Sequence, residues 1–123
     1  MSLCRVFVVE DEILIRKCVV SMLKELGCLI VGETSSGEKA VEMISHDSPD
    51  LVLMDIRLKG SMDGIMAAKE INKYADIPIL FMSAYDYRER IKAENIPNIL
   101  GYLSKPVDDI ALRPYIEKAR TRS

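Results

Sequence analysis

The sequence has no surplus of positive charge, no long hydrophobic run and few cysteines. Seventeen lysines and arginines stand against nineteen aspartates and glutamates, which gives a formal net charge of −2. A chain without a net basic charge has no general electrostatic attraction for nucleic acid or for an anionic membrane. We therefore expect no direct partner of either kind.

No apolar run approaches the roughly 18 residues that a membrane-spanning helix needs, and the acidic residues from Glu10 onward do not suit a signal peptide. This predicts a soluble, cytoplasmic protein. The three cysteines, Cys4, Cys18 and Cys28, are odd in number and lack C-x-x-C spacing. A disulfide framework or a zinc site is therefore not expected, and all three are predicted to be small core residues.

The length of 123 residues, of which 49% are hydrophobic, fits a single globular domain over residues 1–123. The first strand signal starts only at Cys4, and the chain ends abruptly at Ser123. Residues 1–3 are therefore open to interpretation as a leader derived from an expression vector. The domain is likewise open to interpretation as a part excised from a longer protein.

Short runs rich in Val, Ile and Leu alternate with stretches of helical periodicity. The apolar runs cover residues 4–9, 28–32, 51–54, 77–82 and 100–103. Because these runs are nearly unbroken, they are typical of parallel strands that are covered on both faces. The sequence predicts an α/β fold with a five-stranded parallel sheet in the order 2-1-3-4-5, doubly wound and flavodoxin-like.

Several residues predict where the helices begin and end. Ser35 with Glu38, and Asp86 with Glu89, have the spacing of capping boxes for the second and fourth helices. Two single residues mark other ends: Asp63 is expected to cap the start of the third helix, and Gly27 to close the first in a left-handed conformation.

Pro114 predicts an irregular start to the last helix. Proline inside a helix removes a hydrogen bond and clashes with the preceding turn, at a cost of about 3 kcal/mol. We therefore expect a late start, with a regular helix over about residues 113–120, or else a bend.

Polar side chains follow four of the five apolar runs. They are Glu10 and Asp11, Asp55, Ser83, and Lys105. Parallel strands place these ends at one edge of the sheet, where ligands bind. Three neighbouring carboxylates repel one another, and a hard divalent cation, Mg²⁺ (or Mn²⁺), would resolve that repulsion. Asp55 is then the candidate nucleophile for a phosphoryl group, with Lys105 and Ser83 stabilising the transferred oxygens.

The sequence resembles the receiver domains of two-component response regulators over nearly its whole length. The resemblance rests on VVEDE at 8–12, DLVLMDIRL at 50–58, MDG at 62–64, FMSA at 81–84 and GYLSKP at 101–106. Together these motifs are highly specific.

The resemblance implies a phosphorelay function. Asp55 would accept a phosphoryl group from a histidine kinase or a histidine phosphotransfer protein. Asp11, Asp55, Glu10 and the backbone carbonyl of Arg57 would hold the metal ion. The domain would then be a signalling switch rather than a turnover enzyme, although it would assist its own phosphorylation and dephosphorylation.

The resemblance also implies how the switch works. Lys105 would bind the phosphoryl group and precede a cis peptide bond, while Ser83 and Tyr102 would form the switch pair. The surface of the fourth helix, fifth strand and fifth helix would meet an output domain or partner protein, with a phosphorylation-dependent dimer as one mode.

Three features depart from the commonest family pattern. Glu10 stands where aspartate is more frequent, which makes Asp11 the firmer metal ligand. The loop of residues 57–62 carries one additional residue. Arg57 and Tyr85 each lie two residues beyond a site residue, and we hypothesise that these bulky side chains slow hydrolysis of the phosphorylated aspartate.

Three other function classes compete with this interpretation. An aspartate-nucleophile phosphatase would need aspartate at position 57 and threonine or valine at position 59, where Arg57 and Lys59 stand. A flavodoxin-like cofactor module would need a phosphate loop after the first strand. A pseudo-receiver that acts only as an interaction module would commonly lack the acids or the lysine, all of which are present here.

Overall fold

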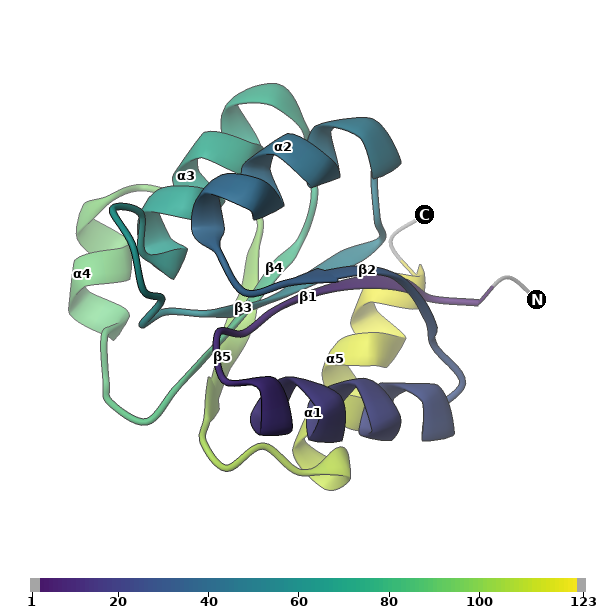
Figure 1. The fold of residues 1–123 in the computed structure, drawn as a ribbon. Coiled ribbons are helices and arrows are strands. Elements are labelled where there is room, and N and C mark those ends of the chain that lie inside the picture. Colours follow the sequence, from purple (N-terminus) through teal and green to yellow (C-terminus); the bar gives the residue numbers. More distant parts are fainter. Residues whose placement is uncertain (1–2, 122–123) are drawn as a thin grey trace.

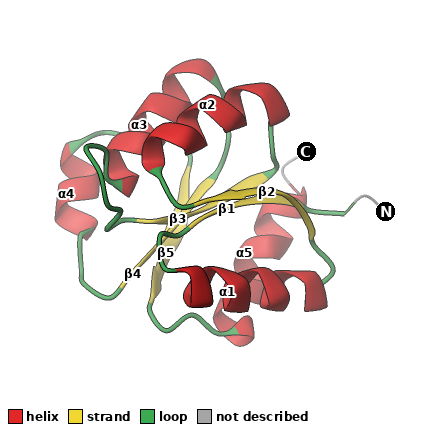
Figure 2. Cartoon of the chain, in the orientation of Figure 1, coloured by secondary structure: helices red, strands yellow, loops and turns green. Residues whose placement is uncertain are grey.

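The structure, a computed structural model, describes residues 3–121, and a parallel five-stranded sheet lies at its centre (Figure 1, Figure 2). The strands are β1 (Arg5–Val9), β2 (Leu29–Thr34), β3 (Leu51–Asp55), β4 (Ile79–Ser83) and β5 (Ile99–Ser104). Their order is β2-β1-β3-β4-β5, and every pairing is parallel. The predicted fold class and strand order are confirmed. Residues 1 and 2 and Ser123, on which the leader and excision interpretations depend, lie outside the described residues.

Helices cover both faces of the sheet (Figure 2). They are α1 (Ile13–Glu25), α2 (Gly37–Asp47), α3 (Gly64–Tyr74), α4 (Arg88–Ala93) and α5 (Asp109–Thr121). The helices α1 and α5 lie on one face, and α2 and α3 lie on the other, with α4 beyond α3 (Figure 1). Among the described residues, no helix combines the length and the apolar character needed to cross a membrane.

The unbroken apolar runs form the central strands because both faces of the sheet are buried. Every residue of β3 and β4 is buried. In β1, Val6 and Val8 pack into the core beneath α1 and α5, whereas Phe7 and Val9 pack into the core beneath α2 and α3. Side chains alternate between the two faces of a strand, so a strand that contributes to two cores must be apolar at every position.

The predicted helix ends are correct at two positions. Asp63 Oδ1 accepts a hydrogen bond from the backbone N–H of Met66 at 2.9 Å and so caps α3. Gly27 follows the end of α1 with a φ of 86°, in the left-handed region that glycine adopts without steric cost.

The two predicted capping boxes are wrong. The cap of α2 is Ser36, not Ser35, because Ser36 Oγ accepts from the N–H of Lys39 at 3.0 Å. Glu38 does not close a capping box; its carboxylate accepts from Ser61 Oγ instead, at 3.3 Å. Asp86 is not the N-cap of α4, which is Tyr87 without a side-chain hydrogen bond, although Asp86 Oδ1 accepts from the N–H of Arg88, the first residue of that helix, at 3.0 Å.

The expected late start of the last helix is also wrong. The helix α5 begins at Asp109, and Asp108 Oδ1 accepts from the N–H of Ala111 at 2.8 Å. Pro114 lies inside the helix and leaves the carbonyl of Ile110 without its helical donor. Both residues are exposed, so water can bond that carbonyl. The buried residues of α5, Leu112 among them, hold the helix against the sheet.

The cysteines do not all lie in the core. Cys4 and Cys28 are buried, but Cys18 is exposed. In α1 it is Val19, Val20 and Leu23 that are buried, and Cys18 faces away from the sheet into the cavity described below. The prediction was wrong for Cys18 because the apolar stripe of α1 is wider than the part of that helix that the sheet buries.

Candidate functional site

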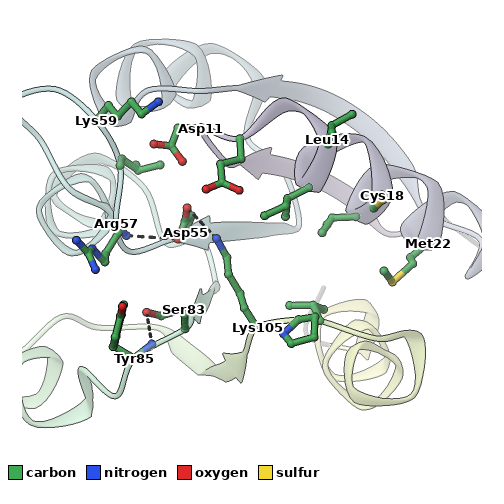
Figure 3. A pocket seen from close by; sticks show the side chains of 17 residues that line it. Asp11, Leu14, Cys18, Met22, Asp55, Arg57, Lys59, Ser83, Tyr85 and Lys105 are labelled. Atoms are coloured by element: carbon green, nitrogen blue, oxygen red, sulfur yellow. Dashed lines mark hydrogen bonds and ion pairs between the residues drawn. The ribbon is translucent and has the colours of Figure 1, made fainter.

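The residues predicted for the site come together at the carboxyl edge of the sheet (Figure 3). Glu10 and Asp11 follow β1, Asp55 ends β3, Ser83 ends β4 and Lys105 follows β5. Strands β1 and β3 are neighbours, so their polar ends meet at the point where the strand order reverses. The topology, rather than closeness along the chain, brings these groups into one site.

Three carboxylates form a cluster that fits a divalent cation. Glu10, Asp11 and Asp55 each offer an oxygen, and these three oxygens lie within 4.8 Å of one another. Glu10 and Asp55 are almost completely buried, whereas Asp11 is half-buried and in contact with solvent. An all-oxygen set with one side open to water is the kind of site that Mg²⁺ or Mn²⁺ prefers.

Lys105 ties two of these carboxylates together. Its Nζ lies 2.6 Å from Glu10 Oε1 and 3.1 Å from Asp55 Oδ2. Backbone groups hold the other oxygens, because the N–H of Glu12 donates to Glu10 Oε2 at 3.0 Å and the N–H of Arg57 donates to Asp55 Oδ1 at 3.3 Å. The peptide bond from Lys105 to Pro106 is cis, as the resemblance implied.

The negative charge of Asp55 is only partly balanced by the positive charge of Lys105. Burial, together with the negative charge of Glu10, raises the pKa of Asp55 to about 7, against the opposing effect of Lys105. Burial also works against ionisation of Glu10, but the Glu12 N–H and the Lys105 ammonium outweigh it and hold the pKa of Glu10 below its ordinary value. One ammonium thus serves two buried carboxylates, and additional positive charge would favour ionised Asp55.

Ser83 and Tyr102, the predicted switch pair, line one pocket beside the site and have different partners. Ser83 is buried, and its Oγ accepts from the N–H of Tyr85 at 3.1 Å, which leaves the hydroxyl hydrogen free to be donated. The Tyr102 ring is 37% exposed and stacks on Phe81, with 6.4 Å between the ring centroids.

The predicted rate-tuning residues contact each other at the mouth of the site. The Arg57 guanidinium lies over the Tyr85 ring, with its carbon 5.1 Å from the ring centroid, which is a cation–π arrangement. The sequence identified both positions separately. It did not show that the two side chains meet, since they follow different strands.

Sequence reasoning also missed an apolar cavity that continues from the acidic cluster. The cavity has a volume of about 870 Å³ and opens between α1 and the segment after β5 (Figure 3). Its apolar wall includes Leu14, Cys18, Met22 and Val107. Leu14 is 76% exposed. The only signal in the sequence was that the apolar stripe of α1 is wider than one contact with the sheet requires.

Gly64, the last residue of the MDG motif at 62–64, is a structural requirement of the site whose physical reason the sequence did not reveal. A Cβ at this position would overlap the backbone carbonyl of Asp55 and lie 2.8 Å from the Cα of Ile56. The N–H of Gly64 also donates to the carbonyl of Ile56 at 2.8 Å. The start of α3 is thus packed directly on the backbone that carries Asp55.

We expect Gly64→Ala to destabilise the domain by about 2 kcal/mol or more, because backbone atoms cannot move aside as a side chain can. Urea unfolding measures this. The control is Gly27→Ala, which has nothing within 4 Å but a positive φ, and which should cost only about 1 kcal/mol. Equal losses in the two variants would contradict the packing argument.

Comparison with known proteins supports one family. The family model described as response regulator receiver domain matches residues 6–117. The transcriptional regulatory protein PdtaR of Mycobacterium tuberculosis is 40% identical over 118 residues, which cover 96% of this chain and 57% of that protein. The probable transcriptional regulator ycf27 of Guillardia theta is 31% identical, over 93% of this chain and 41% of that protein. The chain thus spans about half the length of these curated relatives.

Solved structures agree with the sequence comparison. The signal receiver domain of a modulated diguanylate cyclase from Desulfovibrio desulfuricans superposes with a TM-score of 0.87 at 34% identity, covering 98% of this chain and 96% of that one. The signal receiver domain of the putative response regulator NarL from Mycobacterium tuberculosis gives 0.86 at 28% identity, covering 98% of both chains. With the family match extending over residues 6–117, the chain belongs to the response regulator receiver domain family.

Proposed function

We propose that this receiver domain is a phosphoacceptor of a two-component phosphorelay. Asp55 accepts a phosphoryl group from a histidine kinase or a histidine phosphotransfer protein, and the phosphorylated domain controls a partner or output domain. The observation that carries the proposal is the position of Asp55, between two further carboxylates and the Lys105 ammonium, at the open edge of the sheet.

Asp11, Asp55 and Glu10, with the backbone carbonyl of Arg57, are the groups that would hold Mg²⁺ (or Mn²⁺). When bound, the ion supplies positive charge beside the phosphoryl oxygens. Asp11 is the least buried of the three acids, and Glu10 already has one oxygen at Lys105 and the other at the Glu12 N–H. Asp11 therefore has the carboxylate oxygens best placed for direct contact with the ion.

The chain's own groups then carry out the transfer. A carboxylate oxygen of Asp55 forms the new bond to phosphorus as the bond to the donor nitrogen breaks. The Lys105 ammonium, 3.1 Å from Asp55 Oδ2, would lie within reach of a phosphoryl oxygen, and the Ser83 hydroxyl would donate to another. The role of the protein is mainly to position the groups and to neutralise charge, which suits a switch rather than a turnover enzyme.

The output is proposed to act through the family's usual face, formed by α4, β5 and α5. Receiver domains of response regulators interact with histidine kinases and output domains. Here Tyr102, on β5, is 37% exposed beside Phe81, so its ring has room to turn as Ser83 moves toward the phosphoryl group. A cytoplasmic location and a phosphorylation-dependent dimer belong to the same proposal.

Incubation with acetyl phosphate and Mg²⁺ tests the function directly. Intact mass spectrometry is expected to show the gain of one phosphoryl group, which Asp55→Ala and metal chelation both abolish. The matched control is Asp47→Asn, an exposed acid at the end of α2, which should gain the group normally. No gain with any phosphodonor would instead favour a pseudo-receiver that acts only as an interaction module.

Arg57 and Tyr85 are proposed to slow hydrolysis of the phosphorylated aspartate by restricting the attacking water. Arg57→Ala is expected to shorten the lifetime of phospho-Asp55 several-fold, because it removes the cation that lies over the ring. The decay of the phosphorylated mass after donor removal measures this lifetime.

Two control variants separate shielding from charge in this test. Lys59→Ala removes a cation that also lines the cavity and should leave the lifetime nearly unchanged. Tyr85→Phe keeps the aromatic ring and should therefore keep most of the wild-type lifetime of phospho-Asp55. An unchanged lifetime in Arg57→Ala would exclude the shielding role.

A further inference from the structure

Two buried thiols lie at the end of the sheet opposite the acidic cluster. Cys4 immediately precedes β1, and Cys28 immediately precedes β2. The strands pair in parallel with Arg5 opposite Leu29, and the N–H of Leu29 donates to the carbonyl of Cys4 at 2.9 Å. The register therefore places the two cysteines directly opposite each other, one residue before the first paired positions.

The two side chains also share one face of the sheet. Both belong to the core beneath α1 and α5, where Cys4 is 1% exposed and Cys28 is 7% exposed. The two thiols lie close enough to affect each other's ionisation, because Cys28 raises the pKa of Cys4 and Cys4 lowers the pKa of Cys28. Neighbouring strands in one sheet hold their backbones at roughly 5 Å, which lies within the range of Cα separations that disulfides span.

We propose that Cys4 and Cys28 form a redox-active dithiol, which a hydroperoxide converts to an intramolecular disulfide. Cys28 is the attacking residue. Its sulfur displaces water or an alcohol from the peroxide to give a sulfenic acid, and the Cys4 thiol then attacks that sulfur and releases water. The two thiols lose two electrons and two protons in total, and the peroxide takes them up.

Cys28 has the better position for the first step. It lies in the short connection between α1 and β2 and is 7% exposed, whereas Cys4 is 1% exposed. The neighbouring Cys4 thiol and the Arg120 guanidinium lower the pKa of Cys28 against the effect of burial, whereas Cys28 and burial both raise the pKa of Cys4. Both thiols are buried, but Cys28 is the less buried of the two and the one whose ionisation its neighbours favour.

Stoichiometric hydrogen peroxide on the folded, metal-free protein tests the proposal, followed by alkylation of the remaining thiols and peptide mapping. The expected product is a Cys4–Cys28 peptide pair that has lost two hydrogen atoms, with Cys18 alkylated. The disulfide closes a loop that contains all of α1, so the oxidised protein should melt about 10 °C higher. A thiol reductant should reverse both changes.

The third cysteine provides the matched control. Cys18 is exposed, so Cys18→Ser should form the same disulfide at the same rate. Cys4→Ser should stop at the sulfenic acid of Cys28, which a dimedone label detects. Oxidation confined to Cys18, a disulfide that includes Cys18, or a Cys4–Cys28 disulfide that forms only in denaturant would each overturn the proposal.

This inference is independent of the phosphoacceptor function. The thiols precede β1 and β2, whereas Asp11 and Asp55 stand at the opposite strand ends. The oxidised protein is therefore expected to be phosphorylated by acetyl phosphate as the reduced protein is. Failure of one experiment leaves the result of the other intact.

Discussion

Replacing Lys105 with methionine is expected to destabilise the metal-free domain by about 3 kcal/mol, because the variant leaves a buried carboxylate without its counter-charge. Glu10 is fully buried, and Lys105 Nζ lies 2.6 Å from its Oε1. Methionine retains a long apolar side chain, so most of the loss reflects charge rather than packing. Urea unfolding at pH 7 in the presence of a chelator measures the effect.

The effect of the Lys105 variant should depend on pH in a defined direction. The pKa of Glu10 is held below its ordinary value in the folded protein, partly by Lys105. Such a group stabilises the fold above its unfolded pKa, and that stabilisation is lost as the pH falls through the folded pKa. The difference between wild type and Lys105→Met should therefore be largest near neutral pH and should shrink in acid.

Matched variants distinguish the buried pair from an ordinary ion pair. Lys69 and Glu94 form a contact at 2.9 Å between exposed side chains, and Lys69→Met should cost less than about 1 kcal/mol. Lys105→Arg keeps the charge and should recover part of the stability. Saturating Mg²⁺ should also reduce the difference in the free energy of unfolding between wild type and Lys105→Met. Equal costs for the Lys105 and Lys69 variants would contradict the role assigned to Lys105.

Asp55→Asn is expected to have opposite effects on stability and on function. At pH 8 without metal, the variant should be more stable than wild type by about 2 kcal/mol, because it removes a buried negative charge. With Mg²⁺ and acetyl phosphate, it should gain no phosphoryl group. Thermal unfolding with and without Mg²⁺ measures the first effect, and intact mass measures the second.

The stability gain should appear only as Asp55 ionises. Burial first, and then Glu10, raise the pKa of Asp55 from 3.8 to about 7. Below the unfolded pKa, Asp55 is protonated in both the folded and the unfolded state. Above the folded pKa it is charged in both states, and the folded state then bears the full free-energy cost of a buried negative charge. Wild type should lose stability relative to Asp55→Asn as the pH rises from about 4 to about 7.

Mg²⁺ should reverse the stability order of the two proteins. A ligand that binds only the folded state stabilises it by about 2.7 kcal/mol at a concentration of one hundred times the dissociation constant. Wild type should show this gain, and Asp55→Asn should show little of it. The control Asp47→Asn should behave as wild type in both conditions. A metal-free Asp55→Asn protein that is less stable than wild type at pH 8 would contradict the proposed electrostatics.

The fold was predictable because its signals are local. Each of the five apolar runs became a strand, with ends that differ by no more than two residues from the expected ones. The errors in the predicted elements concern helix ends, where local sequence allows more than one capping residue or starting position. Ser35 and Ser36 are both competent caps, and Ser36 is the cap observed. Pro114 is tolerated inside α5 because Ile110, whose carbonyl it leaves unpaired, lies on the exposed side.

The sequence by itself determined which chemical groups stand at the ends of the strands. Unbroken runs of apolar residues predict parallel strands. Parallel strands in turn predict that Glu10, Asp55, Ser83 and Lys105 lie at the same edge of the sheet. Periodicity reports which face or end of an element a residue occupies, and for this chain that was sufficient to predict which polar side chains stand at the carboxyl edge of the sheet.

Only the tertiary structure decided which of those groups touch. It showed that Lys105 bridges Glu10 and Asp55, that Arg57 lies over Tyr85, and that the register sets Cys4 opposite Cys28. These contacts join residues that are far apart along the chain. Their geometry depends on strand register and side-chain packing, which local sequence patterns do not encode.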